Sequence, residues 1–306
     1  MYTENPLRDV MVFGKACATN LLARFAPSLY VRVTGQTGRG SDDDDVEQIA
    51  SYFEQCLADY RQQLGLDDAA FAQFLQGKRV LEYGPGDILG AALLFHAAGA
   101  ATVHCVDRFP LAKASAKNLR VYQRLLDRLP PAQRVRAAAA FNTPGDPASG
   151  FRGECIGYRV TADGLADRPG AYELIVSRAV LEHVNALDKT LLDVQRCLAP
   201  QGVSVHNVDL RSHNLDRYRP FDFLTWPVWA YRLMYSHKGF PNRWRADTYR
   251  QLLQRHRLHA RAMQPTARLA VADVQRIRAK LAQPFRDADD ESLSWMGFWM
   301  VLEHAA

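Results

Sequence analysis

The chain has 306 residues, of which 48% are hydrophobic and 23% are charged, and its net charge is +5. This length permits one large domain, or one domain with a cap, and the composition is that of an ordinary globular protein. The sequence shows no signal-peptide pattern and no apolar run of 18 residues, and its five cysteines lack CxxC spacing. We therefore expect a soluble cytoplasmic protein without a disulfide framework or a structural zinc site.

The positive charge is concentrated in the C-terminal third. Residues 211–288 hold 16 lysines and arginines against 5 aspartates and glutamates, so the rest of the chain is net negative. This asymmetry indicates either contact with an anionic group, such as a phosphate, a nucleic acid or a membrane surface, or a solvated arginine-rich surface.

Residues 1–77 are predicted to form a helical segment that covers the cofactor or substrate site. Within it, residues 42–62 carry apolar side chains every three or four positions, which is typical of an amphipathic helix. The acidic run Asp42–Asp45 precedes these positions. We interpret it as the N-terminal cap of the helix rather than as a cation site, because negative charge stabilises the positive end of a helix dipole.

From residue 78 onward, short apolar runs alternate with helical patterns. The predicted strands are 78–83, 102–107, 157–162, 172–178 and 202–208. The predicted helices are 88–98, 111–129 and 186–198, and residues 130–156 are expected to be an irregular insertion. Strands that alternate with helices of this length indicate βαβ units and a parallel sheet with right-handed crossovers.

The alternation changes after residue 210. Residues 211–245 interleave aromatic residues with arginines and are predicted to be a cap inserted after the fifth strand. Helices 246–256 and 270–282 and strands 258–264 and 293–303 are expected to follow. The predicted fold is thus a doubly wound, seven-stranded, mostly parallel α/β sheet with N-terminal helices, in which residues 78–306 form the main domain.

The first predicted strand ends in the turn Glu82-Tyr-Gly-Pro-Gly-Asp87. Ligands of open α/β sheets bind at the carboxyl ends of the strands, where glycines let the backbone approach them and a proline stiffens the turn. A diphosphate-binding turn would have a third glycine where Leu89 stands, and Glu82 would repel a diphosphate. The turn therefore favours a ligand with an ammonium or sulfonium group.

The second predicted strand ends in Asp107, 25 residues after Glu82. A carboxylate at this place can accept hydrogen bonds from both hydroxyls of a ribose. The alternative is that Asp107 caps the next helix.

Four segments together resemble the class I S-adenosylmethionine-dependent methyltransferases over residues 78–208. They are Val80–Asp87, Val106–Phe109, Val160–Gly164 and Tyr172–Val184. The resemblance implies S-adenosylmethionine as methyl donor, with S-adenosylhomocysteine as product. The implied cofactor-binding residues are Glu82, Tyr83, Gly84, Pro85, Gly86, Asp107, Arg108, Phe109, Asp163, Gly164, Ser177 and Arg178. Ile88 stands where the family often has another glycine.

A second, looser similarity concerns the N-terminal region together with residues 206–213 and 242–245. These resemble segments of methyltransferases from bacterial surface-polysaccharide gene clusters, which implies polysaccharide biosynthesis and a sugar or glycan precursor as acceptor. The aromatic residues of 211–245 could stack on such a sugar, or form the core of the cap instead. The arginines could pair with a phosphate on an anionic substrate.

Methyl transfer needs correct positioning and, for a hydroxyl acceptor, a base. The candidates are His206, His183 and Asp209, with His213 as a weaker one. A histidine can accept a proton near neutral pH, but both leading histidines could equally have a hydrogen-bonded structural role. No Asp and His set has divalent-metal spacing, so no metal is expected.

Other functions remain as alternatives. A natural-product O- or N-methyltransferase uses the same chemistry. A nucleic-acid methyltransferase agrees with the basic C-terminal third, but no RNA-binding module is recognisable and no Asn-Pro-Pro-Tyr motif follows the fourth strand. A membrane-surface-associated protein would use Trp226 and Trp229 at the interface. The sequence carries no indication of oligomeric state.

Overall fold

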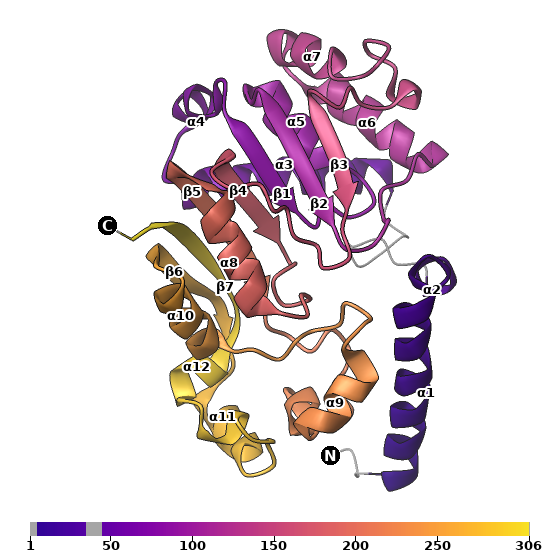
Figure 1. The fold of residues 1–306 in the computed structure, drawn as a ribbon, viewed down its shortest axis with the longest axis vertical. Coiled ribbons are helices and arrows are strands. Elements are labelled where there is room, and N and C mark those ends of the chain that lie inside the picture. Colours follow the sequence, from indigo (N-terminus) through magenta and orange to yellow (C-terminus); the bar gives the residue numbers. More distant parts are fainter. Residues whose placement is uncertain (1–4, 35–44, 306) are drawn as a thin grey trace. The chain divides into compact units, whose positions relative to one another are not determined.

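The computed structural model describes residues 5–34 and 45–305, which divide into two compact units (Figure 1). The sheet unit comprises Gly35–Arg178, Asp193–His206 and Val301–Ala306, and the cap unit comprises Met1–Thr34, Ala179–Leu192 and Asn207–Met300. The predicted N-terminal segment 1–77 is therefore divided between the two units. Among the described residues, no helix is long and apolar enough to cross a membrane.

Seven strands form one sheet in the order β3-β2-β1-β4-β5-β7-β6. Their bounds are β1 Arg79–Tyr83, β2 Thr102–Asp107, β3 Ile156–Val160, β4 Tyr172–Arg178, β5 Leu198–Asp209, β6 Leu258–Arg268 and β7 Trp295–His304. Strand β1 pairs in parallel with both β2 and β4, which places Glu82 opposite Cys105 on one side and opposite Val176 on the other. The chain order reverses between β1 and β4, which is the ligand-binding switch point of doubly wound sheets. The predicted fold class is confirmed.

The helices of the sheet unit are α3 Val46–Gln63, α4 Asp68–Leu75, α5 Gly90–Ala98, α6 Ala116–Arg128 and α7 Pro131–Ala138; α8 Leu187–Cys197 runs from the cap unit into the sheet unit. Three of them, α3, α4 and α6, begin after a residue whose side chain caps them. Asp45 forms a capping box with Gln48, accepting from its N–H at 2.8 Å. The predicted cap is confirmed at Asp45, whereas residues 42–44 lie outside the described residues.

The prediction of an irregular insertion over residues 130–156 is wrong in part. Pro131, at the first helical position, begins α7, and the 3-10 helix η1 (Pro147–Ser149) follows. The rings of Phe141 and Phe151 stack with centroids 4.6 Å apart, and Phe141 is fully buried. The small residues of this segment therefore cover a local aromatic core instead of forming an open loop.

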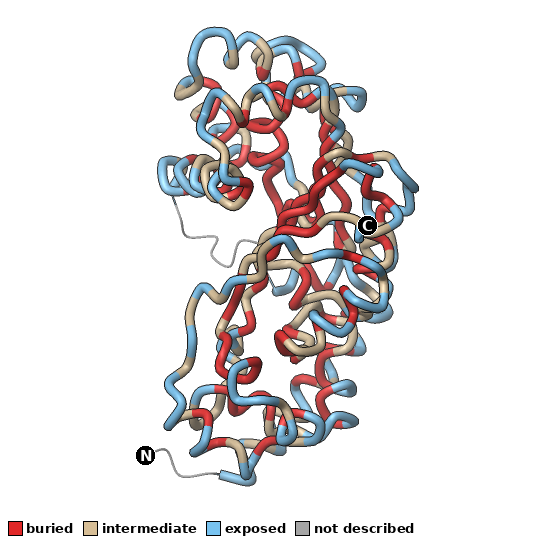
Figure 2. Tube along the Cα trace, turned by 90° about the vertical axis from the view of Figure 1, so that its left-hand side faces the viewer, coloured by how far each residue is buried: buried red, intermediate tan, exposed pale blue. Residues whose placement is uncertain are grey.

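The cap unit has its own hydrophobic core. Its elements are α1 Pro6–Phe25, α2 Pro27–Thr34, η2 Asp222–Thr225, α9 Val228–Tyr235, α10 Ala246–Arg255, α11 Val271–Arg278, η3 Phe285–Asp287 and α12 Asp290–Ser294. Phe221, Phe223, Tyr231 and Met234 are buried together in this core, and α1 packs on α9. Figure 2 shows the buried positions along the elements of each unit. For the three aromatic residues among them, the structure supports a place in the core of the cap rather than a sugar-stacking surface.

Several cations of the cap unit are used inside it. Arg245 is buried and donates from Nη1 to the carbonyl oxygen of Leu210 at 2.8 Å, with its guanidinium 4.6 Å from the ring centroid of Phe221. Arg243 donates from Nη1 to the carbonyl of Trp226 at 2.6 Å, and Lys238 donates from Nζ to a carbonyl of α1 at 3.0 Å. Part of the positive charge of residues 211–288 thus satisfies buried carbonyl groups.

Candidate functional site

The glycine turn after β1 requires backbone angles that favour glycine. Gly84 has φ 64° and Gly86 has φ 78°, both in the left-handed region. The N–H of Gly84 donates to the carbonyl oxygen of Val106 at 2.8 Å, which ties the turn to β2. The turn is thereby fixed beside the ends of two adjacent strands, with no side chain at either glycine to keep a ligand from the backbone.

Glu82 ends β1 as a buried carboxyl group. The thiol of Cys105 lies 3.6 Å from its Oε2. Burial raises the pKa of Glu82 to about 7; the Cys105 thiol lowers this pKa slightly, and the neighbouring Asp107 carboxylate raises it. Without a cationic partner, the ionised form of this group is disfavoured in the fold, as expected of a carboxylate that binds a positively charged ligand group.

Asp107 is the last residue of β2, and one of its two carboxylate oxygens accepts hydrogen bonds from described residues. Its Oδ1 accepts from the N–H groups of Arg108 and Phe109 at 2.8 and 3.4 Å, whereas its buried Oδ2 has no hydrogen-bond partner among the described residues. Burial raises the pKa of Asp107 to about 6, and backbone N–H groups oppose this rise. Asp107 does not cap a helix, because α6 begins at Ala116 with Ser115 as its N-cap.

The adenosine-side residues predicted from the sequence lie near one another. The guanidinium of Arg108 lies 5.1 Å from the ring centroid of Phe109, and the Asp163 carboxylate raises the pKa of Arg108 against the larger effect of burial. Gly164, at φ 72°, is so close to Arg108 that a β-carbon on it would lie 3.5 Å from that of Arg108. Asp163 itself is exposed.

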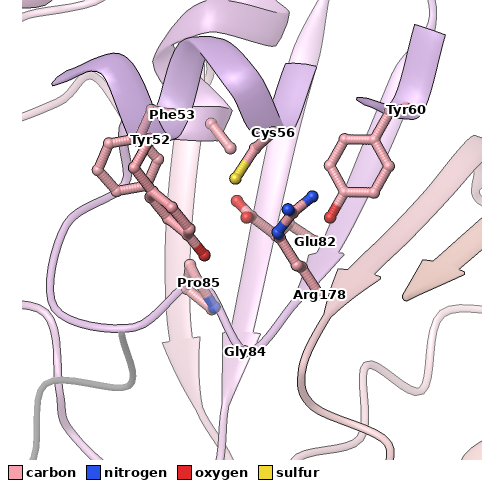
Figure 3. A pocket seen from close by; sticks show the side chains of 9 residues that line it. Tyr52, Phe53, Cys56, Tyr60, Glu82, Gly84, Pro85 and Arg178 are labelled. Atoms are coloured by element: carbon pink, nitrogen blue, oxygen red, sulfur yellow. The ribbon is translucent and has the colours of Figure 1, made fainter. Parts of the chain in front are cut away.

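Helix α3 forms one wall of a pocket over the glycine turn (Figure 3). The pocket is lined by Tyr52, Phe53, Cys56, Tyr60, Glu82, Gly84, Pro85, Ala91 and Arg178. Arg178 donates to Asp59 of α3 at 2.6 Å. Helix α3 also lies very close to α5, because a β-carbon on Gly90 would come within 2.4 Å of the Phe53 ring. The part of the N-terminal segment that lines this pocket is therefore α3.

Three predicted site residues point elsewhere. The hydroxyl of Tyr83 donates to Asp193 at 2.6 Å in a buried contact, so its side chain is directed at α8. Ser177 Oγ and His206 Nδ1 are 2.7 Å apart, and both residues are fully buried. Burial lowers the pKa of His206 to about 3, so the ring is neutral. These contacts favour the hydrogen-bonded structural role of His206 over that of a base.

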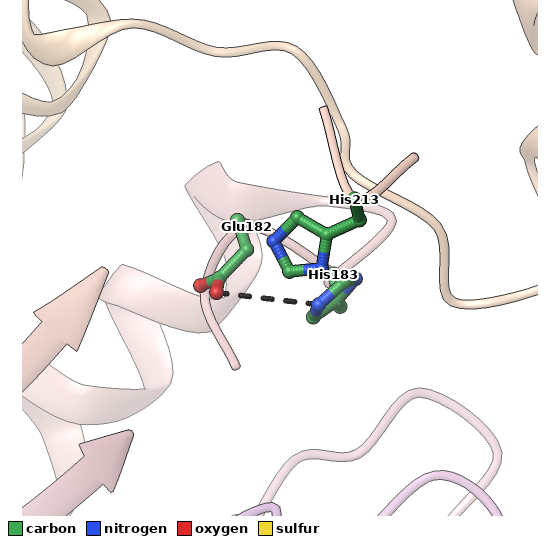
Figure 4. A group of neighbouring side chains, drawn as sticks. All are labelled: Glu182, His183 and His213. Carbon is green, nitrogen blue, oxygen red and sulfur yellow. Dashed lines mark ion pairs between the residues drawn. The ribbon is translucent and has the colours of Figure 1, made fainter. Parts of the chain in front are cut away.

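His183 and Asp209 belong instead to a group of side chains in the cap unit. Glu182, His183 and His213 turn toward one another (Figure 4) and offer one ligand atom each within 4.8 Å of the others. His183 Nε2 lies 4.0 Å from Glu182 Oε1, and the two imidazole rings meet edge to face. Asp209 Oδ2 lies 3.7 Å from His213 Nε2. We call Glu182, His183 and His213 the Glu-His-His cluster.

Burial favours the neutral form of both histidines of this cluster. It lowers the pKa of His183 to about 3, with His213 adding to the effect and the backbone of Gly239 opposing it. Burial also lowers the pKa of His213, while Asp209 raises it. Burial raises the pKa of Glu182 well above its usual range.

Comparison with known proteins assigns the family. A family model described as a methyltransferase domain matches residues 52–259. The chain belongs to this methyltransferase family. No curated protein matches the chain in sequence. Its own sheet order agrees with the S-adenosylmethionine-dependent class I fold that the sequence predicts.

Solved methyltransferases show limited similarity to this chain. An S-adenosylmethionine-dependent methyltransferase from Mesorhizobium loti has 16% identity and a TM-score of 0.43, over 74% of this chain and 91% of that one. Geranyl diphosphate C-methyltransferase from Streptomyces coelicolor has 15% identity and a TM-score of 0.39, over 78% and 77%. Phosphoethanolamine N-methyltransferase 2 from Haemonchus contortus has 13% identity and a TM-score of 0.42, over 78% and 52%. Similarity at this level carries no information on the acceptor.

Sequence reasoning missed two features of this methyltransferase. The first is the α3 wall of the pocket, whose Tyr52, Cys56 and Tyr60 were recognisable only as the apolar face of a helix. The second is the Glu-His-His cluster, because His213 is 30 residues from His183 and only the fold brings them together. The Glu-His pair after β4 was the one available signal.

Proposed function

We propose that this methyltransferase transfers the methyl group of S-adenosylmethionine to an oxygen (or nitrogen) of a small-molecule acceptor, with a sugar or glycan precursor as the best single candidate. The observation that carries the placement of the donor is the free, buried Oδ2 of Asp107, together with the buried carboxyl of Glu82 on the adjacent strand. Oδ2 of Asp107 lacks a hydrogen-bond partner among the described residues, Glu82 has only the thiol of Cys105 beside it, and both carboxyl groups suit groups of this donor.

The described residues fit the donor part by part. Asp107 would accept hydrogen bonds from the ribose hydroxyls, and Glu82 would bind the amino group of the methionine part. Gly84 and Gly86 would let the backbone approach that part closely. Arg108, Phe109 and Asp163 would lie along the adenosine. When bound, the donor supplies a methyl group on a positively charged sulfur, whose transfer leaves S-adenosylhomocysteine.

We place the loss of the acceptor proton at the Glu-His-His cluster. His183 and His213 are about one quarter exposed, whereas His206 is fully buried. The cluster follows β4 and β5 in the chain. Asp209 lies beside His213 and would orient that ring.

The choice of a sugar rests on the similarity of residues 206–213 and 242–245 to polysaccharide-cluster methyltransferases. Stacking on the cap adds little support, because Phe221, Phe223 and Tyr231 are buried in the core of the cap unit. Arg211, whose side chain is 57% exposed and lies 3.9 Å from Asp209 Oδ2, is a candidate for contact with an anionic substrate group.

The test is a turnover assay with S-adenosylmethionine and a panel of acceptors: nucleotide sugars, glycan fragments, phenols and amines. Formation of S-adenosylhomocysteine and a product heavier by one methyl group supports the proposal, and the acceptor atom is assigned by NMR. Calorimetry on wild type and Asp107→Asn tests the donor site separately. We expect binding in the wild type and a loss of at least about tenfold in the variant, because a buried hydrogen bond to a charged group is lost. Equal affinities would overturn the donor placement.

A second proposed property is contact with a membrane surface. The exposed apolar side chains of two packed helices in the cap unit are Leu7, Val10, Met11, Leu21 and Phe25 of α1, and Val228, Trp229 and Leu233 of α9. Exposed apolar side chains near arginines suit an anionic bilayer. Trp226, by contrast, packs under Arg217 at 4.1 Å. Co-sedimentation with anionic vesicles should weaken in Trp229→Ala/Leu233→Ala, and equal sedimentation would remove this proposal.

A further inference from the structure

The Glu-His-His cluster contains a buried carboxyl group without a partner. Glu182 is 1% exposed, and neither of its side-chain oxygens has a hydrogen-bond partner among the described residues. The hydroxyl of Tyr249, close enough to Glu182 for their charges to interact, is likewise unpartnered. A buried carboxyl group with so few partners is unfavourable in the fold, and a cation bound to its oxygens would compensate it.

The two imidazoles have the same character. Nδ1 of His183 and Nε2 of His213 are buried atoms without a hydrogen-bond partner among the described residues. The backbone of Gly239 interacts with the His183 ring, and that of Asp209 interacts with the His213 ring. Histidines that bind metals typically have one nitrogen on the metal and the other held by a backbone or carboxylate group.

From this geometry we propose that Glu182, His183 and His213 bind a divalent first-row transition-metal ion. Two imidazoles and one carboxylate form the ligand set of catalytic zinc sites and of related iron and manganese sites, which leave at least one position open. Mg²⁺ and Ca²⁺ prefer oxygen ligands and are expected to bind poorly. With metal–ligand bonds of about 2.1 Å, neighbouring ligand atoms of a tetrahedral site lie about 3.4 Å apart. The present separations, of up to 4.8 Å, would therefore shorten by up to about 1.4 Å on binding.

A rigid backbone supports this site. Asn242 donates from Nδ2 to the carbonyl oxygen of Leu181 at 2.7 Å and to that of Val184 at 3.2 Å, and its N–H donates to the carbonyl of Glu182 at 2.6 Å. These contacts hold the segment that carries Glu182 and His183. Asn242 is the first residue of segment 242–245, which resembles a segment of polysaccharide-cluster methyltransferases. We assign to Asn242 the role of positioning the backbone of Glu182 and His183.

A metal ion bound to the cluster would lower the pKa of the acceptor hydroxyl group. A hydroxyl bound at the open position of a divalent cation loses its proton far more readily than a free hydroxyl, and the proton goes to solvent. The two histidines then act as ligands and not as free bases. This role rests on the proposed function, whereas the binding of the ion rests only on the cluster.

Binding is tested on the full-length, untagged protein after removal of metals with a chelator. Zn²⁺ and Co²⁺ are titrated by calorimetry, and the visible spectrum of Co²⁺ reports its coordination number. We expect one site in the wild type, with affinity weakened by more than about 100-fold in Glu182→Gln and His213→Ala, because even outer groups of metal sites contribute 10- to 100-fold. His259→Ala, which removes an exposed histidine outside the cluster, is the matched control and should bind like the wild type. Mg²⁺ is the ionic control.

The outcomes separate this inference from the proposed function. Absence of a Zn²⁺ or Co²⁺ site in the wild type, or equal affinity in Glu182→Gln, would overturn the metal site. Glu182→Gln keeps the shape of the side chain, and a thermal melt verifies that the variant folds. Binding that depends on Glu182 and His213 supports the site whether or not an acceptor has been found. Once turnover is measured, activity that is unchanged by chelation would overturn the role in acidification while the site itself stands.

Discussion

Replacing Glu82 with glutamine should stabilise the ligand-free protein while weakening its binding of S-adenosylmethionine. Burial raises the pKa of Glu82 from 4.5 to about 7. Each pKa unit corresponds to about 1.4 kcal/mol, so ionisation of Glu82 costs the native state about 3 kcal/mol at pH 8. The unfolded chain binds fewer protons than the native state between pH 4.5 and 7, so the stability of the wild type falls as the pH rises through this range.

The assay is urea unfolding of wild type and Glu82→Gln at pH 5 and pH 8. At pH 5 the two proteins should differ little through this group, whereas at pH 8 the variant should gain up to about 3 kcal/mol in free energy of unfolding. Glu173→Gln is a control of opposite sign. Burial raises the pKa of Glu173, but hydrogen bonds from the side chain and N–H of Arg79 outweigh that effect and hold this pKa below its usual value. A gain in Glu82→Gln that is equal at both pH values would refute the reasoning.

The same carboxyl group should control the pH dependence of donor binding. In the proposed donor site the ionised forms of Glu82 and Asp107 would bind the donor, and burial raises their pKa values to about 7 and about 6. Affinity for S-adenosylmethionine should therefore fall as the pH drops from 8 to 5. In Glu82→Gln the affinity should be lower at pH 8, and its decrease should begin only near pH 6. Calorimetry at four pH values would show this, and a wild-type affinity that does not change with pH would contradict it.

Three further substitutions test structural roles. Tyr83→Phe removes the buried hydrogen bond to Asp193 and should lower the free energy of unfolding by about 2 kcal/mol, with donor affinity unchanged. A selective loss of donor affinity would instead show that Tyr83 belongs to the cofactor site. Arg245→Met leaves the carbonyl groups of Leu210 and Trp295 unpaired and should lower the free energy of unfolding by about 3 kcal/mol, measured with urea. An unchanged stability would show that the hydrogen bonds of Arg245 do not outweigh the cost of burying its guanidinium charge. Asn242→Ala should reduce turnover and Zn²⁺ affinity with donor affinity unchanged, measured by assay and calorimetry; unchanged Zn²⁺ affinity would refute its positioning role.

The regular parts of the fold were predictable because local signals and packing agree. The strand 102–107 has the predicted bounds. Its buried apolar residues mark the strand in the sequence, and Asp107 marks its carboxyl end. Strand β5 begins at Leu198, four residues before the predicted start, because pairing within the sheet extends it through Pro200. Pairing with neighbouring strands is a tertiary effect that a turn-like Pro-Gln-Gly sequence conceals.

The candidate site was predictable where its residues end strands and not where they come from distant segments. Glu82 and Asp107 follow from strand position alone. The roles of His206 and of the cap arginines depended on burial, which a sequence does not reveal for polar residues. His206 is fully buried, and Arg245 is 2% exposed. Polar side chains placed inside a fold look in the sequence like candidates for catalysis or for binding anions.

Because α3 lies very close to α5 at Gly90, substitution at this position would change the distance between the two helices, which is useful in enzyme engineering. A single methyl group at position 90 would collide with the Phe53 ring and lift the helix that carries Tyr52, Cys56 and Tyr60. The opening of the donor pocket is thus set by the absence of one carbon atom. A graded series at positions 53 and 90, from Phe–Gly to Leu–Ala, would tune how bulky a donor analogue the enzyme admits, which is useful where synthetic sulfonium reagents are to deliver groups larger than methyl.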